Sequence, residues 1–317
     1  MYKKSNYLLL IIAFASLCSC KKDAQINNIV QTSPVYSGKY LLFDADESFN
    51  KSFNPSQSIF PSPYTSIYYS NLDGSKITPI TGSDSGYYSY RASWSPDGKQ
   101  VLFIHGNQSG TDRSLCIIDI TGDNFKSVVK GNEVDFASFS PDGEKLVYAK
   151  SLVDDYKYDV YVSNVDGTSE QRITNFANDN GAVANIHWSS DGKIYFYGSG
   201  SHTTGGIYSI NEDGSNLKYI MLPVDFLGIS PDGKKILFDL SNGLFICNID
   251  GTNIKTIISY DNNNPNMLVG ASWSADGNEI YVSNADYPAN FGLYKLKADG
   301  SGLHQILAGY YEFPVVF

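Results

Sequence analysis

The chain has 317 residues, a formal net charge of −10 and a sequence pI of ≈ 4.8. Nucleic acids and anionic membrane surfaces attract proteins with a basic surface, so this charge argues against both as partners. Hydrophobic residues make up 42% of the sequence, enough for a large core, and the 24 Tyr and 17 Phe favour strands over helices.

The amino-terminal segment has the organisation of an export signal. Lys3 and Lys4 form a basic start, an apolar segment covers 8–15, and Leu17-Cys18-Ser19-Cys20 follows. The apolar segment is too short to span a bilayer. Its Leu-x-Ser-Cys ending resembles the lipobox of bacterial lipoproteins, which implies that Cys20 is the lipidated first residue of the mature protein. An ordinary secretory signal with incidental cysteines is the alternative.

We therefore expect a lipoprotein signal peptide over 1–19, a lipidated tether over 20–32 and a folded domain over 33–317. Several acyl chains on one cysteine anchor a protein stably, whereas a single chain does not. The expected location is the bacterial cell envelope, on the outer membrane, either periplasmic or surface-facing. Membrane contact is expected through the lipid anchor only.

A hairpin motif recurs along the folded domain. Ser95-Pro96-Asp97-Gly98 follows a strand that ends at Trp94 and precedes a strand over 100–103. In a type I turn, Pro presets φ at the second position, Asp suits the third, and Gly supplies the positive φ needed to enter the next strand. Equivalent turns, all of which keep the Asp-Gly pair, lie at 140–143, 189–192, 230–233 and 274–277.

A second turn alternates with the first, at 72–75, 121–123, 165–168, 212–215, 249–252 and 298–301. Four strands per repeat and six copies of this turn give a period of about 45 residues, the length of one propeller blade. A β-solenoid has much shorter rungs, and a sandwich would not repeat its turn chemistry.

The two ends of the domain are expected to pair with each other. Gly86-Tyr87-Tyr88-Ser89-Tyr90 has a near copy at 309–313, and the chain stops where the next turn would begin. We therefore place 313–317 as the innermost strand of blade one, beside a strand over 39–43. The predicted fold is an all-β, six-bladed β-propeller of four-stranded antiparallel blades, closed by the C-terminal strand joining blade one.

The W-S-P-D-G-K hairpins and the intervening N-x-D-G-[ST] turns resemble the repeats of TolB-like, WD40-related six-bladed β-propellers of the bacterial envelope. The resemblance covers roughly residues 33–317 and implies the fold. It does not imply an activity, since propellers host both binding proteins and enzymes.

The two cysteines of the expected mature domain are predicted to be unpaired. The repeat register places Cys116 and Cys247 in the third strands of blades two and five, which face each other across the ring. A disulfide needs Cα atoms within about 7 Å, so both are expected to be small buried core residues.

Any binding face is expected at the end of the blades opposite the Asp-Gly turns, because the longer and more variable connections lie there. Loop tyrosines offer flat amphipathic contact area, and carboxylates at the inner-strand ends could reach the channel. His187 replaces the Ser or Gly of equivalent strands, although a packed, hydrogen-bonded histidine is the plainer explanation. The binding-face candidates are Tyr87, Tyr88, Tyr90, Asp135, His187, Asp225, Tyr310 and Tyr311.

Motifs for metal, cofactor or covalent catalysis are missing from the sequence. The four His lack a His-x-x-His or His-Glu-x-x-His spacing, and neither a G-x-S-x-G elbow nor a phosphate loop occurs. We therefore expect no metal, no cofactor and no catalytic residue.

The function predicted from the sequence is a non-catalytic envelope module, monomeric, that binds or scaffolds a protein, peptide or glycan. A carbohydrate-active lyase or hydrolase that uses channel-mouth carboxylates, such as Asp135 and Asp225 paired across the channel, together with His187 is the main alternative. A calcium-stabilised adhesion module is a third possibility.

Overall fold

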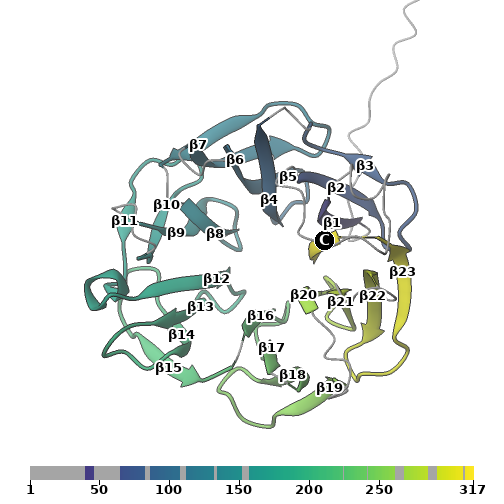
Figure 1. Cartoon of the computed structure of the whole chain (residues 1–317). Coiled ribbons are helices and arrows are strands. Elements are labelled where there is room, and N and C mark those ends of the chain that lie inside the picture. Colours follow the sequence, from purple (N-terminus) through teal and green to yellow (C-terminus); the bar gives the residue numbers. More distant parts are fainter. Residues whose placement is uncertain are drawn as a thin grey trace, which may run out of the picture. The chain divides into compact units, whose positions relative to one another are not determined.

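The strands of the computed structural model form six four-stranded antiparallel sheets, arranged as blades in a ring around a central axis (Figure 1). The predicted all-β, six-bladed fold is confirmed. The expected signal peptide, Cys20, the tether and Tyr310 lie outside the described residues. The structure describes residues 40–45, 65–82, 86–107, 112–131, 134–151, 157–223, 225–240, 242–260, 268–284, 291–309 and 311–317.

In each blade the first strand named here is innermost (Figure 1). Blade 1 contains β24 (Tyr311–Val316), β1 (Tyr40–Ala45), β2 (Ser66–Asn71) and β3 (Thr78–Pro79). Blade 2 contains β4 (Tyr87–Trp94), β5 (Gln100–Asn107), β6 (Arg113–Asp119) and β7 (Lys126–Lys130). Blade 3 contains β8 (Val134–Phe139), β9 (Lys145–Lys150), β10 (Asp159–Asn164) and β11 (Gln171–Arg172).

Blade 4 contains β12 (Ala182–Trp188), β13 (Ile194–Ser199), β14 (Gly206–Ile210) and β15 (Lys218–Met221). Blade 5 contains β16 (Asp225–Ile229), β17 (Lys235–Leu240), β18 (Gly243–Asn248) and β19 (Lys255–Ser259). Blade 6 contains β20 (Leu268–Trp273), β21 (Glu279–Asn284), β22 (Gly292–Lys297) and β23 (His304–Ala308). The described part of the chain adds one short 3₁₀ helix, η1 (Phe176–Asp179), and holds no helix long and apolar enough to cross a membrane.

The C-terminal strand closes the ring as predicted. β24 pairs antiparallel with β1, with Val315 opposite Leu42. The indole N–H of Trp94 donates to the carbonyl of Val315 at 3.2 Å, and the ring of Phe317 lies 5.7 Å from that of Trp94 between centroids. The end of the chain is therefore held by blade 1 through its backbone and by blade 2 through side chains.

The repeated turns have the predicted chemistry. Gly143 has a φ of 76°, a conformation that glycine adopts without a steric penalty. The hydroxyl of Ser140 donates to Asp142 at 2.6 Å and accepts from the backbone N–H of Lys145 at 2.9 Å. These hydrogen bonds satisfy the polar groups of the turn with partners inside the turn itself. The local sequence therefore specifies the hairpin independently of the rest of the fold.

Apolar side chains fill the space between consecutive blades. One cluster joins Leu102 and Ile104 of blade 2 to Leu146 and Tyr148 of blade 3, and comparable clusters lie at the other five junctions. Cys116 and Cys247 are free and buried in such clusters, as predicted. Burial raises the pKa of the Cys116 thiol to about 12 and that of Cys247 to about 11, so both remain protonated.

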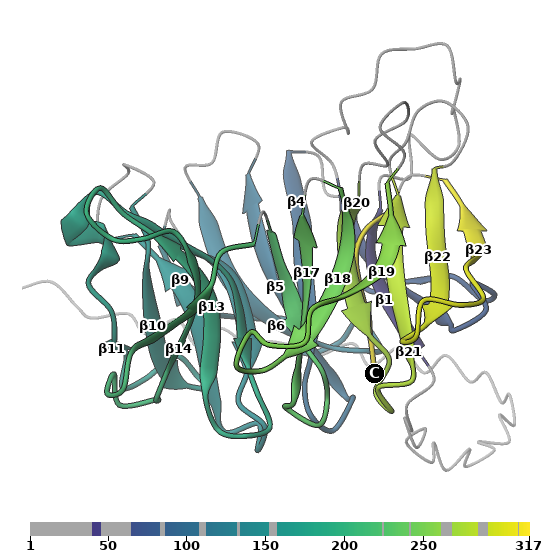
Figure 2. The same ribbon diagram turned by 90° about the horizontal axis from the view of Figure 1, so that it is seen from below.

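The two ends of the blades differ (Figure 2). Both sets of Asp-Gly turns join first to second and third to fourth strands, so they lie together at what we call the tight-turn end. The connections from second to third strands and from blade to blade lie at the opposite, loop end. The inner strands start at the loop end, so their first residues, including Tyr87 and Asp225, lie there.

Candidate functional site

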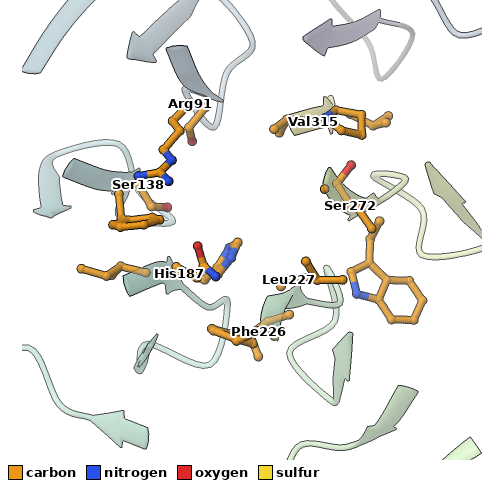
Figure 3. Close-up of a pocket in the computed structure, with 18 of the residues that line it drawn as sticks. Arg91, Ser138, His187, Phe226, Leu227, Ser272 and Val315 are labelled. Carbon is orange, nitrogen blue, oxygen red and sulfur yellow. The ribbon is translucent and has the colours of Figure 1, made fainter. Parts of the chain in front are cut away.

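The inner strands enclose a cavity of ≈ 310 Å³, called here the central cavity (Figure 3). Small side chains at one position of these strands create the space, since a larger residue at every blade would fill the channel. In each blade the residue at this position pairs with the corresponding residue of the second strand. It holds Ser93, Ser138, His187, Gly228, Ser272 and Val315.

His187 lines the cavity, where it takes the place of a smaller residue. Its ring meets Phe226 edge-on with 5.1 Å between centroids, and it leans over Gly228, where an added Cβ would lie 3.5 Å from Cε1. The side chain keeps some exposed surface toward the cavity but lies deep in the ring. Loss of bulk water at that depth lowers the pKa of His187 to about 4, so the imidazole is neutral at physiological pH.

Every inner strand carries a β-bulge against its neighbour. In three consecutive blades a bulge residue has a left-handed backbone: Arg91 with φ 53°, Phe136 with φ 44° and Asn185 with φ 49°. Such conformations cost on the order of 1–3 kcal/mol for residues other than glycine. All three residues line the cavity, and bulges redirect side chains beside functional sites.

Arg91 is tied to blade 3. Its Nη1 lies 2.6 Å from Oδ1 of Asp135, and its guanidinium carbon lies 3.7 Å from the centre of the Phe136 ring. Arg113 approaches the other oxygen of Asp135 at 4.0 Å. The carboxylate of Asp135 therefore positions two arginines.

A buried carboxyl group in blade 1 holds the backbone of Arg91. Asp44 is 0% exposed, and its Oδ2 accepts the backbone N–H of Arg91 at 2.6 Å. Its Oδ1 has no hydrogen-bond partner among the described residues. Burial raises the pKa of Asp44 well above its usual value, and the charge of Glu312, directly opposite on β24, adds to the rise.

Across the channel, Asp225 begins the inner strand of blade 5. Asn185 of blade 4 donates to its Oδ1 at 2.6 Å, and Asp239 is its direct cross-strand partner. Desolvation raises the pKa of Asp225 although it keeps surface exposed at the cavity. Desolvation also raises the pKa of Asp239, to about 6, despite a hydrogen bond from the Tyr260 hydroxyl, and the Asp225 charge adds to this rise.

The predicted binding-face residues separate into groups. His187 and Asp225 line the cavity. The rings of Tyr88 and Tyr90 lie 5.2 Å apart near Arg91 and Arg113, and burial raises the pKa of Tyr90. Tyr311 is only 8% exposed and packs against Phe43, so it belongs to the core of blade 1.

Tyr87 lies away from the channel. It borders a second cavity, of ≈ 290 Å³, beside blade 2 together with Phe125 and Ser127. Its ring stacks on His105 at 5.2 Å, and its hydroxyl donates to Asp112 at 3.2 Å. The seven candidates among the described residues thus do not form one surface.

Sequence reasoning missed Arg91, Asn185, Asp239, Tyr260 and Trp273. The first two stand two positions before Ser93 and His187, so an inspection of that position in every repeat would have found them. Asp239 and Tyr260 had no such signal, because their importance comes from cross-strand pairing. Among the described residues no group of three or more His, Cys, Asp or Glu side chains could hold a metal ion.

No family model and no curated protein sequence matches the chain. Solved structures do match. TolB from Acinetobacter baumannii has a TM-score of 0.67 and 16% identity, covering 88% of this chain and 66% of that one, so this chain spans just under two thirds of its length. A putative TolB from Agrobacterium tumefaciens has a TM-score of 0.57 and 16% identity, with coverages of 89% and 99%.

The chain has the TolB-like six-bladed propeller fold. An oligogalacturonate lyase solved in complex with manganese matches the chain more distantly, with a TM-score of 0.54 and 13% identity over 73% of each chain. A TolB-like propeller is thus the scaffold here, and the residues of its channel must carry the functional argument.

Proposed function

We propose that this TolB-like propeller is a non-catalytic binding or scaffolding module whose ligand enters the central cavity from the loop end. The observation that carries the proposal is the cavity itself. Its ≈ 310 Å³ lie within the size range of small-molecule sites, and small and apolar walls surround a few polar groups, which is the usual composition of such sites. Strained residues at the wall, such as Phe136 with φ 44°, support the same assignment.

Filling the cavity tests this function. Ser138→Phe and Ser272→Phe introduce rings where the channel is open, and Ser127→Phe places the same ring in the second cavity as a matched control. The full chain is screened by thermal shift and calorimetry against short peptides and oligosaccharides. A ligand that stabilises the wild type and the control but neither channel variant supports the proposal. Equal binding to all four proteins, or no binding by any compound, contradicts it.

We further propose that the module is held in the cell envelope by lipid on Cys20. The Leu-x-Ser-Cys segment and the basic and apolar residues before it support this anchor. Cys20→Ala should move the protein from the membrane fraction to the soluble fraction, and Cys18→Ala is the control that should not. Membrane retention of the Cys20→Ala protein would exclude the lipid anchor.

The enzymatic alternative, a carbohydrate-active lyase or hydrolase, has one observation in its favour. Asp225 and Asp239 are direct cross-strand partners, and Asp239, with a pKa of about 6, is suited to act as a general acid or base near neutral pH. Incubation with oligogalacturonides and neutral oligosaccharides, read by reducing ends and by unsaturated-uronate absorbance, tests it. Turnover that Asp239→Asn abolishes would establish the enzyme, and unchanged substrates would leave the binding module.

A further inference from the structure

The charged groups that line the central cavity come from opposite blades. Arg91 belongs to blade 2 and Asp225 to blade 5, which lie across the channel from each other (Figure 1). Desolvation raises the pKa of Asp225 overall, but the Arg91 charge opposes this rise, so each group lies within the electric field of the other. The cavity therefore has a cationic wall and an anionic wall.

The carboxyl group of the anionic wall, that of Asp225, has a second carboxyl group beside it on the neighbouring strand, that of Asp239, which is not itself part of the cavity lining. Asp225 and Asp239 are direct cross-strand partners, a position in which like charges destabilise a sheet. Their hydrogen-bond donors, Asn185 and Tyr260, are neutral, and neither carboxyl group forms a salt bridge with a described residue. A cation placed at this wall would relieve the repulsion between them.

A buried donor in the wall points to a ligand independently of the charges. Trp273 lines the cavity and is 6% exposed, but its indole N–H has no acceptor among the described residues. The equivalent Trp94 donates to the Val315 carbonyl at 3.2 Å. A buried N–H without an acceptor is costly, so an acceptor on a bound ligand would stabilise this wall.

We propose that the central cavity binds a small zwitterion, an amino acid or short peptide, with its ammonium group at Asp225, where the neighbouring Asp239 adds negative charge, and its carboxylate at Arg91. The inference rests on the proposed binding function and names its ligand class. A guanidinium has five N–H donors, so Arg91 binds the ligand carboxylate while it keeps Asp135. A peptide carbonyl then meets the Trp273 indole, which favours a short peptide over a free amino acid.

Three related probes test the charge requirement. Isothermal titration of the full chain uses dialanine, N-acetyl-dialanine, which lacks the ammonium group, and dialanine amide, which lacks the carboxylate. We expect dialanine to bind and each capped form to bind at least roughly tenfold more weakly, because each leaves one wall unpaired. Equal affinities for the three probes, or no binding of dialanine and trialanine at millimolar concentration, would overturn the inference.

Variants locate the two ends of the ligand. Asp225→Asn should weaken dialanine binding at least roughly tenfold and should leave N-acetyl-dialanine unaffected, since that probe has no cation to lose. Asp123→Asn, in an exposed turn at the tight-turn end, is the matched control. A general folding defect in the Asp225 variant would weaken both probes alike, and such an outcome counts against the assignment.

The inference can fail while the proposed function stands. An oligosaccharide whose binding Ser138→Phe abolishes, together with no binding of dialanine, would retain the binding module and reject the zwitterion. Trp273→Phe adds a separate readout, because it removes the indole donor and should weaken dialanine more than alanine. The same change for both ligands would exclude the carbonyl contact.

Discussion

The carboxyl group of Asp44 in blade 1 accepts the backbone N–H of Arg91 in blade 2, with 2.6 Å between Oδ2 and N. Arg91 has a left-handed backbone with φ 53°, and its side chain lines the cavity. A buried group in one blade therefore fixes a strained residue of the next. Residues outside the cavity wall thus set the direction of the arginine inside it.

The unfolding free energy of Asp44→Asn, relative to that of the wild type, should be higher at neutral pH than at acid pH. The folded chain raises the pKa of Asp44, so it holds this proton more tightly than the unfolded chain. The wild type therefore loses stability as pH rises above the unfolded value of about 4, by about 1.4 kcal/mol for each pKa unit of difference. Asparagine keeps the hydrogen-bond acceptor and does not titrate. Urea unfolding of both proteins at pH 4 and pH 7 therefore measures how far the variant gains stability relative to the wild type as pH rises.

Asp142→Asn is the control of opposite sign. Hydrogen bonds from Ser140 and from the Glu144 backbone lower the pKa of Asp142, so its stabilisation is present above the unfolded pKa and is lost as pH falls. This variant should be less stable than the wild type at pH 7 and nearly equal to it at low pH. Parallel pH profiles for the two variants would contradict both assignments.

The C-terminal Phe317 packs against one glycine turn but not against another, so glycine-to-alanine substitutions in the two turns should lower the free energy of unfolding by different amounts. Gly98 has φ 67°, and a methyl group there would overlap the ring of Phe317. Gly192 has φ 82°, and a methyl group there would meet nothing within 4 Å. Gly192→Ala should therefore cost only the left-handed penalty, about 1–2 kcal/mol, and Gly98→Ala should cost more. Denaturant unfolding of both variants measures the difference.

Phe317→Ala removes the obstruction and should bring the cost of Gly98→Ala down to that of Gly192→Ala. A double-mutant cycle measures this coupling. Additive effects would show that the Phe317 ring does not pack on the turn.

Deletion of 313–317 should lower the thermal midpoint markedly, because it removes most of β24 from β1 and the Trp94 acceptor at Val315.

The fold was predictable because its information is local and repeated. Ser-Pro-Asp-Gly turns such as the one at Ser95 determine hairpins by themselves, and their spacing determines the blade. The pairing of β24 with β1 was also predictable, since the C-terminal segment copies the start of β4. The bounds of these two strands differ from prediction by one or two residues, because pairing partners, not the repeat, determine where a strand ends.

The site was less predictable because it depends on departures from the repeat. Arg91 and Asn185 stand at one strand position where other blades have Phe or Gly, and only the bulge geometry turns them toward the cavity. The tyrosines of the similar segments at 86–90 and 309–313 were all predicted to lie on one binding face. Tyr311 is instead buried, and Tyr87 lies beside a different cavity. His187 could be singled out from the sequence, because alignment of the repeats shows it in place of the Ser or Gly of equivalent strands.

His187 should not titrate in the physiological range. Its depth in the ring lowers its pKa to about 4, so its imidazole signals in NMR spectra should stay constant from pH 8 to about pH 5.5. His304, on the exposed outer strand β23, gives a reference signal for comparison, and His187→Gln assigns the resonance.

The same shift predicts how stability depends on pH. Between about pH 6.5 and 4 the unfolded chain binds a proton at His187 that the folded chain does not, so the wild type loses stability as pH falls through this window. Glutamine has no such proton, and the difference in unfolding free energy between His187→Gln and the wild type should shift in favour of the variant as pH falls. A titration midpoint near 6.5, with a difference that does not vary with pH, would mean that water reaches His187 freely.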